Sequence, residues 1–189
     1  MTGRLIVIVA ASGAGKDTLL ASAAAARPDL HLVRRVITRP AALGGEGFDG
    51  VDEAEFERRR QAGGFAVWWA AHGLRYGVPV EVRRRLARGE TVLLNGSRDA
   101  LPEIRAVFPD LSLILIVAPK DALRERLVRR GRETEAEIDA RLARADRPTP
   151  AGALVVRNDG TVEGGVARLL AAIQRCASGG GFNGDPERI

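Results

Sequence analysis

The chain has 189 residues, the length of one domain, and its 46% hydrophobic content is enough for a buried core. The net charge of +5 leaves two function classes open: a nucleic-acid binder and an enzyme for highly phosphorylated small molecules. Arginine is spread along the whole chain, and aromatic residues make up only 4% of it. Because such a chain has little surface on which bases could stack, nucleic acid is the less favoured partner.

Several other classes are excluded by what the sequence lacks. Cys176 is the single cysteine, so neither an internal disulfide nor a cysteine-rich metal site is expected. No apolar run approaches the roughly 18 residues that a membrane span needs. The apolar N-terminal run is too short for a signal peptide. We therefore expect a cytoplasmic protein with no membrane partner, and the oligomeric state stays open.

The first predicted elements surround a glycine-rich loop. Residues 4–10 predict a buried parallel strand, and residues 16–26 predict a helix. A strand, a glycine-rich turn and a helix N-terminus together are typical of a phosphate-binding loop, whose backbone N–H groups form an anion-binding nest. Lys16 would reach the β- and γ-phosphates of ATP. The predicted ATP-binding residues are Ala10, Ala11, Ser12, Gly13, Ala14, Gly15, Lys16, Asp17 and Thr18.

This loop departs from G-x-x-x-x-G-K-[ST] at two positions. Ala10 stands where the first glycine is expected, and Asp17 stands where a serine or threonine usually binds Mg²⁺. The metal could therefore be held by Asp17, by Thr18, or by the nucleotide and water alone. Lys16 and Lys120 are the only lysines among 29 basic residues, so a lysine in this loop of an arginine-using chain favours phosphate binding.

Residues 30–79 combine basic and glycine-rich segments. Residues 30–37 predict a second strand, and the arginines at its end suit either an anion site or a solvated basic turn. Asp52 predicts a helix start with Glu55 reaching back to cap it. Residues 65–70 predict a small strand. Residues 72–79 predict a turn, in which Tyr76 could donate a hydrogen bond to a phosphate.

The second half alternates strands and helices. Predicted helices cover 80–88, 121–130 and 162–177, and predicted strands cover 90–94, 111–117 and 154–156. Asn95, Ser97 and Arg98 follow the strand at 90–94, at the end of a parallel strand where ligands bind. Charges of both signs fill residues 124–147, which predicts either a salt-bridged helix pair or a mobile lid.

Together these elements predict an α/β class, three-layer P-loop NTPase fold with about five parallel strands. We expect a single kinase domain over 1–177 and a flexible tail over 178–189. Its core would be 1–33, 80–121 and 148–177, with an acceptor-binding subdomain at 34–79 and a helical lid at 122–147.

The order of motifs over residues 4–177 resembles the guanylate kinase-like branch of the nucleoside monophosphate kinases. The landmarks are Ser12-Gly13-Ala14-Gly15-Lys16, Thr38-Arg39, Gly45-Glu46, Phe65, Trp68, Gly73, Tyr76-Gly77 and Arg130-Gly131. The chain departs from that family at several positions, two of which concern the base: the family reads guanine with a glutamate and a Ser/Thr, where this chain has Val67 and Val78. Valine leaves the guanine N–H groups unpaired, at a cost of about 1–3 kcal/mol each, so the pocket is not built for GMP.

A closer resemblance is to the ribose 1,5-bisphosphate phosphokinase family, in which the aspartate after the loop lysine is part of the pattern. The segments that carry it are Gly13-Ala14-Gly15-Lys16-Asp17-Thr18, residues 34–40, Gly45-Glu46, residues 69–74, residues 76–79 and Asn95-Gly96-Ser97-Arg98. The resemblance implies that ATP, with Mg²⁺, phosphorylates the 1-phosphate of ribose 1,5-bisphosphate, a phosphorylated sugar of phosphonate breakdown. The product would be 5-phosphoribosyl 1-diphosphate.

The same resemblance implies roles for particular residues. Lys16 and the lid arginines Arg129, Arg130 and Arg141 would act on the transferred group. The acceptor phosphates would bind Arg35, Arg39 and Tyr76, with Arg75 or Arg98 on the second phosphate. The ribose hydroxyls would be oriented by Glu46, His72, Asn95 and Ser97. A nucleoside monophosphate kinase with unusual base selectivity and a non-catalytic guanylate kinase-like binding module remain the alternatives.

Overall fold

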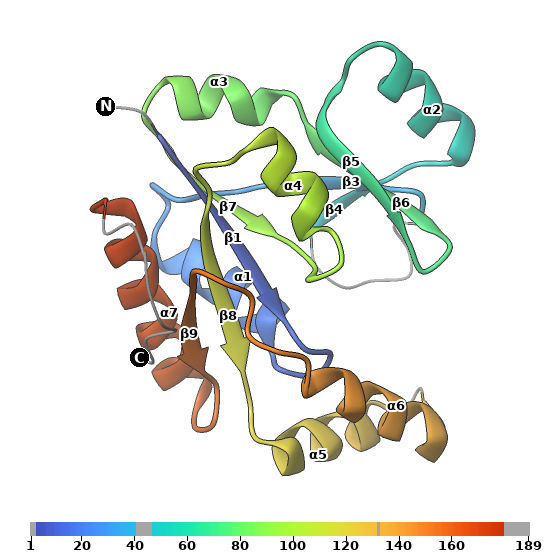
Figure 1. Ribbon diagram of the computed structural model, residues 1–189, viewed down its shortest axis with the longest axis vertical. Coiled ribbons are helices and arrows are strands. Elements are labelled where there is room, and N and C mark those ends of the chain that lie inside the picture. The colour runs from blue at the N-terminus through green and yellow to red at the C-terminus, as the bar shows by residue number, and fades with distance from the viewer. Residues whose placement is uncertain (1–2, 41–46, 132, 180–189) are drawn as a thin grey trace.

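The computed structural model describes residues 3–40, 47–131 and 133–179 and is built on two sheets (Figure 1). The larger sheet is parallel, with strand order β2-β7-β1-β8-β9, and the smaller one has the order β4-β3-β6-β5. The strands are β1 (Arg4–Ala10), β2 (His31–Leu32), β3 (Arg35–Ile37), β4 (Phe48–Gly50), β5 (Phe65–Ala71), β6 (Leu74–Pro79), β7 (Thr91–Asn95), β8 (Ser112–Val117) and β9 (Ala153–Arg157). The helices are α1 (Lys16–Ala26), α2 (Glu53–Gln61), α3 (Glu81–Ala87), α4 (Leu101–Val107), α5 (Lys120–Arg130), α6 (Glu135–Ala145) and α7 (Val162–Ala177).

The five-stranded parallel sheet confirms the predicted three-layer fold. Strand β1 is central, and alternate side chains of its apolar run enter the two halves of the core. Ile6 and Ile8 pack with α1 and α7, whereas Val7 and Val9 pack with α3, α4 and the smaller sheet. Helices α5 and α6 lie beyond the carboxyl ends of β1 and β8 (Figure 1), which is where a parallel sheet presents its ligand site.

The strand predicted over residues 30–37 is wrong in one respect, because it is two strands in two sheets. Strand β2 pairs with β7, and the backbone N–H of Val33 still donates to Leu93 of that strand. At Arg34 the side chain turns outward to Asp49, and β3 then pairs with β4 and β6. The smaller sheet therefore begins where the chain leaves the larger one.

The turn predicted over 72–79 is also shorter than expected. Only His72 and Gly73 form it, both with positive φ, and Leu74–Pro79 is strand β6. Asp52 caps α2 as predicted, accepting from the Glu55 N–H at 2.7 Å, but the Glu55 carboxylate pairs with Arg58 and Arg59 instead of reaching back.

Helix α4 was not predicted, since its seven residues are too few to show an apolar repeat, although the proline in its first turn is typical of a helix start. Within the described ranges, no helix is long and apolar enough to cross a membrane. The predicted tail lies outside these ranges from residue 180 onward.

Candidate active site

The glycine-rich loop between β1 and α1 has the backbone that anion binding requires. Gly13 and Gly15 adopt φ of 86° and 82°, in the left-handed region that glycine enters without strain. A Cβ on Gly15 would lie 2.5 Å from the side-chain nitrogen of Asn158. Asn158 follows β9, is buried, and donates to the Ala14 carbonyl at 2.8 Å. The loop is therefore held from the end of β9, two strands away from β1 in the sheet, as well as from its own helix.

Lys16 is positioned by residues at the end of β7. Its Nζ donates to Asn95 Oδ1 and to the Gly96 carbonyl, the latter at 3.1 Å. Asn95 Nδ2 in turn donates to Asp17 Oδ1 at 3.0 Å. Burial lowers the pKa of Lys16 to about 8; the Asp17 carboxylate opposes this shift and the charge of Arg35 adds to it. An anion beside Lys16 would therefore favour its charged form.

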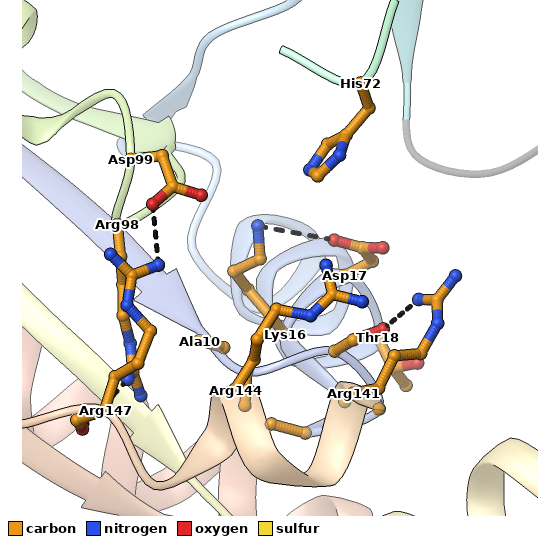
Figure 2. Close-up of a pocket in the computed structure, with 15 residues that line it drawn as sticks. Ala10, Lys16, Asp17, Thr18, His72, Arg98, Asp99, Arg141, Arg144 and Arg147 are labelled. Carbon is orange, nitrogen blue, oxygen red and sulfur yellow. Dashed lines mark hydrogen bonds and ion pairs between the residues drawn. The ribbon is translucent and has the colours of Figure 1, made fainter. Parts of the chain in front are cut away.

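A cavity of about 620 Å³ opens over this loop and is strongly cationic (Figure 2). Besides the loop, its walls come from α6, from the residues after β7, and from His72 in the β5–β6 turn. Five cationic residues face two carboxylates, so the lining needs anions for charge balance. These residues are Lys16, Arg98, Arg141, Arg144 and Arg147, with Asp17 and Asp99.

The α6 wall is linked to the loop and to the core by hydrogen bonds. Arg141 donates to Ser12 Oγ at 2.5 Å and pairs at 3.3 Å with Glu133, whose side chain is only 10% exposed. Arg147, just beyond α6, pairs with Asp99 at 2.6 Å. Figure 2 shows Arg141, Arg144 and Arg147 on the α6 side of the cavity, with His72 on the opposite side.

A second cavity, of about 540 Å³, lies on the β9 side of the same loop. Arg126 of α5 spans it, donating to the carbonyls of Gly13 at 3.5 Å and Asn158 at 3.3 Å. Thr161 and Arg129 also line it. The phosphate loop therefore has a cavity on each side.

Two of the predicted acceptor residues, Arg35 and Tyr76, form a stack with Trp69 beside the loop. The guanidinium of Arg35 lies 5.4 Å from the Tyr76 ring, and the Tyr76 ring stacks on Trp69 at 5.5 Å. Arg35 is only 8% exposed, and burial lowers its pKa to about 10, although Tyr76 and Asp17 oppose the shift. The guanidinium of Arg39, which follows β3, lies 5.7 Å from the ring of Phe48 on the neighbouring strand β4. Arg35 and Tyr76 thus share one stack close to Asp17.

Other predicted residues lie elsewhere or have protein partners. Arg75 pairs with Glu53 at 3.0 Å and with Glu57 at 3.3 Å on α2, so it is directed toward that helix. The Ser97 hydroxyl accepts from the Ala100 N–H at 3.2 Å. Both Arg75 and Ser97 are therefore left out of the site that we propose.

The residues predicted for the lid and for ribose binding do not all lie in one site. Arg129 lines the second cavity, away from Arg141. Asn95 forms hydrogen bonds with Lys16 and Asp17, so it positions the lysine. Glu46 and the side chain of Arg130 lie outside the described part of the structure.

Six polar or charged cavity residues were missed by the sequence interpretation: Asp99, Arg126, Arg144, Arg147, Asn158 and Thr161. A signal existed for Arg144, because it follows Arg141 by three residues and so shares its helix face. Asn158 follows a parallel strand, where ligand residues gather. Asp99 lies between β7 and α4, so the same strand-end signal applies to it, whereas Arg126 reaches the loop only through the packing of α5, which no local pattern predicts.

Asp17 and Thr18 are the oxygen donors available for a metal ion beside the loop. Both are exposed and line the first cavity. Carboxylate, hydroxyl and phosphate oxygens are ligands that Mg²⁺ accepts while keeping several waters. No group of three or more His, Cys, Asp or Glu that could hold a metal is found among the described residues. The donor set fits an ion that is shared with a nucleotide.

Val67 and Val78 pair across β5 and β6. Their exposures are 6% and 0%, and both belong to the core between the two sheets. They present no hydrogen-bonding side chain at the positions where the resemblance places guanine recognition.

A family model described as guanylate kinase matches residues 2–175. Among solved structures, guanylate kinase from Anaplasma phagocytophilum is similar in fold, with a TM-score of 0.62, 22% identity, and coverage of 92% of this chain and 85% of that one. The fold and the loop thus define a protein of the guanylate kinase class.

Curated relatives narrow the class. The chain is 44% identical to ribose 1,5-bisphosphate phosphokinase PhnN from Agrobacterium fabrum, covering 92% of this chain and 97% of the relative. The Rhizobium etli protein of the same name is 48% identical, and the match covers 83% of this chain and 78% of the relative. A third relative is a bifunctional ribose 1,5-bisphosphokinase-thymidine phosphorylase from Cupriavidus necator, to which the chain is 44% identical. The match covers 92% of this chain but only 29% of that longer protein. The chain therefore belongs to the ribose 1,5-bisphosphate phosphokinase family within this class.

Proposed function

We propose that this protein is a phosphotransferase that moves the γ-phosphoryl group of ATP to the 1-phosphate of ribose 1,5-bisphosphate, a step of phosphonate breakdown. The observation that carries the proposal is the cationic cavity over a phosphate loop whose lysine is already positioned by Asn95 and Gly96. The names of the relatives support the same substrate.

The nucleotide would occupy the second cavity with its nucleoside and extend over the loop with its phosphates. That cavity is large enough for a nucleoside and adjoins the phosphate-binding nest, so it would hold the nucleoside part of ATP. Arg126, Arg129 and Thr161 line the side next to β9. The β- and γ-phosphates would then lie on the loop amides and Lys16, with the γ-phosphate facing the first cavity.

The reacting phosphate of the acceptor would bind beside Arg35, Arg39 and Tyr76. These residues sit on β3, β6 and the segment after β3, so the smaller sheet forms one wall of the acceptor side. We keep 34–79 as the proposed acceptor-binding subdomain and 122–147 as the proposed lid. Because Val67 and Val78 offer no acceptor to a purine N–H, a base-free acceptor is favoured over GMP.

The reaction needs positioning more than proton transfer. The nucleophile is an ionised phosphate oxygen, so no strong general base is required. As that oxygen bonds to the γ-phosphorus, the bond to the bridging oxygen breaks and ADP leaves. Lys16 and Arg141 would neutralise the charge on the transferred group, and Asp17 and Thr18 would hold Mg²⁺, which supplies charge neutralisation at the β- and γ-phosphates.

The test is a paired assay with ATP and Mg²⁺, offering ribose 1,5-bisphosphate and GMP separately and resolving products by anion-exchange chromatography. Phosphoribosyl diphosphate from the first, and no GDP from the second, would support the proposal. GDP formation without turnover of the sugar bisphosphate would contradict it and favour the monophosphate-kinase alternative. If neither product forms although the protein still binds ATP, the non-catalytic binding module would be favoured.

A further inference from the structure

Three arginines that line the first cavity have no role in the mechanism above. Arg98 follows β7, Arg144 lies on α6, and Arg147 follows α6. All three line the cavity that contains the phosphate loop. Arg98 also donates to the Arg147 carbonyl at 3.1 Å, so the core and the α6 segment already meet here.

The strand order shows which side of the loop this is. The loop follows β1, which lies between β7 and β8 in the sheet. The second cavity adjoins Asn158 and Thr161, beyond β9, on the β8 side of β1. Arg98 and its neighbours follow β7, on the opposite side of β1. They are therefore on the acceptor side of the transferred group.

The charges in this group are not balanced by the protein. Asp99 pairs with Arg147. Arg98 Nε is buried without a hydrogen-bond partner among the described residues, and burial and the charge of Arg147 lower the pKa of Arg98, although Asp99 opposes the shift. Arg144 donates to the Ala140 carbonyl of its own helix, and no carboxylate pairs with it in residues 3–40, 47–131 and 133–179. Three guanidinium groups and one carboxylate leave a charge that one phosphate monoester dianion would match.

We propose that Arg98, Arg144 and Arg147 bind the 5-phosphate of the acceptor, the phosphate that does not react; this inference rests on the proposed function. Guanidinium groups suit a phosphate because they donate in pairs to its oxygens. Arg98 belongs to the core and Arg144 to α6, so this phosphate would bridge the two. Its binding free energy would then hold α6 over the reacting group and raise kcat, not only affinity.

The test combines a protein substitution with a truncated substrate. Ribose 1-phosphate keeps the reacting phosphate and lacks the remote one. With ribose 1,5-bisphosphate, Arg144→Ala is expected to lower kcat/KM by about 10- to 100-fold, the effect of losing charge-assisted hydrogen bonds. With ribose 1-phosphate, the same substitution is expected to lower kcat/KM by a factor several-fold smaller than the factor measured with ribose 1,5-bisphosphate. Equal losses with both substrates would overturn the proposal, because they would place Arg144 on the transferred group.

Two further variants control for charge and folding. Arg144→Lys keeps the charge and is expected to recover part of the lost kcat/KM for the bisphosphate. Arg84→Ala removes an arginine whose side chain is 78% exposed on α3, and it is expected to change neither substrate's kinetics. A loss in Arg84→Ala equal to that in Arg144→Ala would indicate a general charge effect and would also overturn the assignment.

A binding measurement separates this inference from the proposed function. Ribose 5-phosphate, titrated by calorimetry into the ATP-free protein, carries only the remote phosphate. Binding that weakens at least ten-fold in Arg144→Ala supports the subsite even if the bisphosphate is not turned over, in which case the proposed function alone fails. Binding that is absent, or equal in the wild type and the variant, counts against the subsite even if turnover is observed.

Discussion

The ammonium group of Lys16 is shared between Asn95 and Gly96, and Asn95 is also bound to Asp17. This arrangement fixes a long, flexible side chain before any phosphate arrives, so less rotamer entropy is lost on binding. The position of the catalytic lysine therefore depends on an amide that carries no charge.

Replacing Lys16 by alanine should remove phosphoryl transfer. The transition state loses a cation at the transferred group, and losses on the order of 100-fold or more in kcat follow from removing one such contact. Steady-state kinetics would measure the effect, and far-UV circular dichroism would confirm that the variant folds. Transfer at an undiminished rate would contradict the role of this loop.

The lowered pKa of Lys16 predicts a pH dependence of ATP binding. A lysine with a pKa of about 8 is mostly charged at pH 7 and mostly neutral at pH 9. Since ATP favours the charged form, its affinity should fall about ten-fold between these pH values. Calorimetric titration at several pH values measures this. Lys16→Arg stays charged throughout, so any binding it retains should lose this dependence; a flat wild-type profile would contradict the prediction.

His72 can be tested apart from its turn. It has φ of 53° and precedes Gly73 at 72° in a two-residue hairpin turn, a conformation in which asparagine is preferred. His72→Asn should therefore leave the thermal midpoint equal or slightly higher. Because His72 faces the cavity, kcat/KM for the acceptor should fall, by about ten-fold if one hydrogen bond is lost. Unchanged kinetics would show that His72 only forms the turn.

At the scale of elements, α6 carries three cavity arginines in or just beyond it, but little of it is buried. Ile138 is its one buried residue among those described. Its start is instead stabilised locally, by a capping box between Thr134 and Glu137. Helix α7 begins with a similar threonine cap, Thr161 to Gly164, but buries a long apolar face. The two helices therefore allow a matched comparison.

Thr134→Ala should act on α6 and Thr161→Ala on the whole domain. Each loses a cap worth about 0.5–2 kcal/mol. In Thr134→Ala, amide exchange should accelerate mainly within residues 135–145, because a poorly buried helix opens locally. In Thr161→Ala the midpoint of global unfolding should fall. Hydrogen exchange with mass spectrometry and thermal unfolding distinguish them, and equal global destabilisation by both would mean that α6 is part of the main cooperative unit.

At the scale of the whole molecule, the sequence predicted the five-stranded sheet and the loop because their signals are local. The apolar run of β1 directly precedes the glycines, and α7 has its predicted bounds. The smaller sheet was not predicted, since β3 and β4 have three residues each and are defined only by their partners. For the same reason the role of Asn95 was not predictable: it faces Lys16 because Asn95 pairs with Ile8 in the sheet.

Transfer of the γ-phosphoryl group of ATP onto a sugar phosphate can be followed directly by ³¹P nuclear magnetic resonance of the reaction. With ATP, Mg²⁺ and ribose 1,5-bisphosphate, we expect two coupled diphosphate signals of the sugar product together with the signals of ADP. These signals should grow as the sugar 1-phosphate signal disappears, and they should be absent with Lys16→Ala. Loss of the ATP γ-signal to inorganic phosphate alone, with the sugar bisphosphate intact, would contradict this transfer.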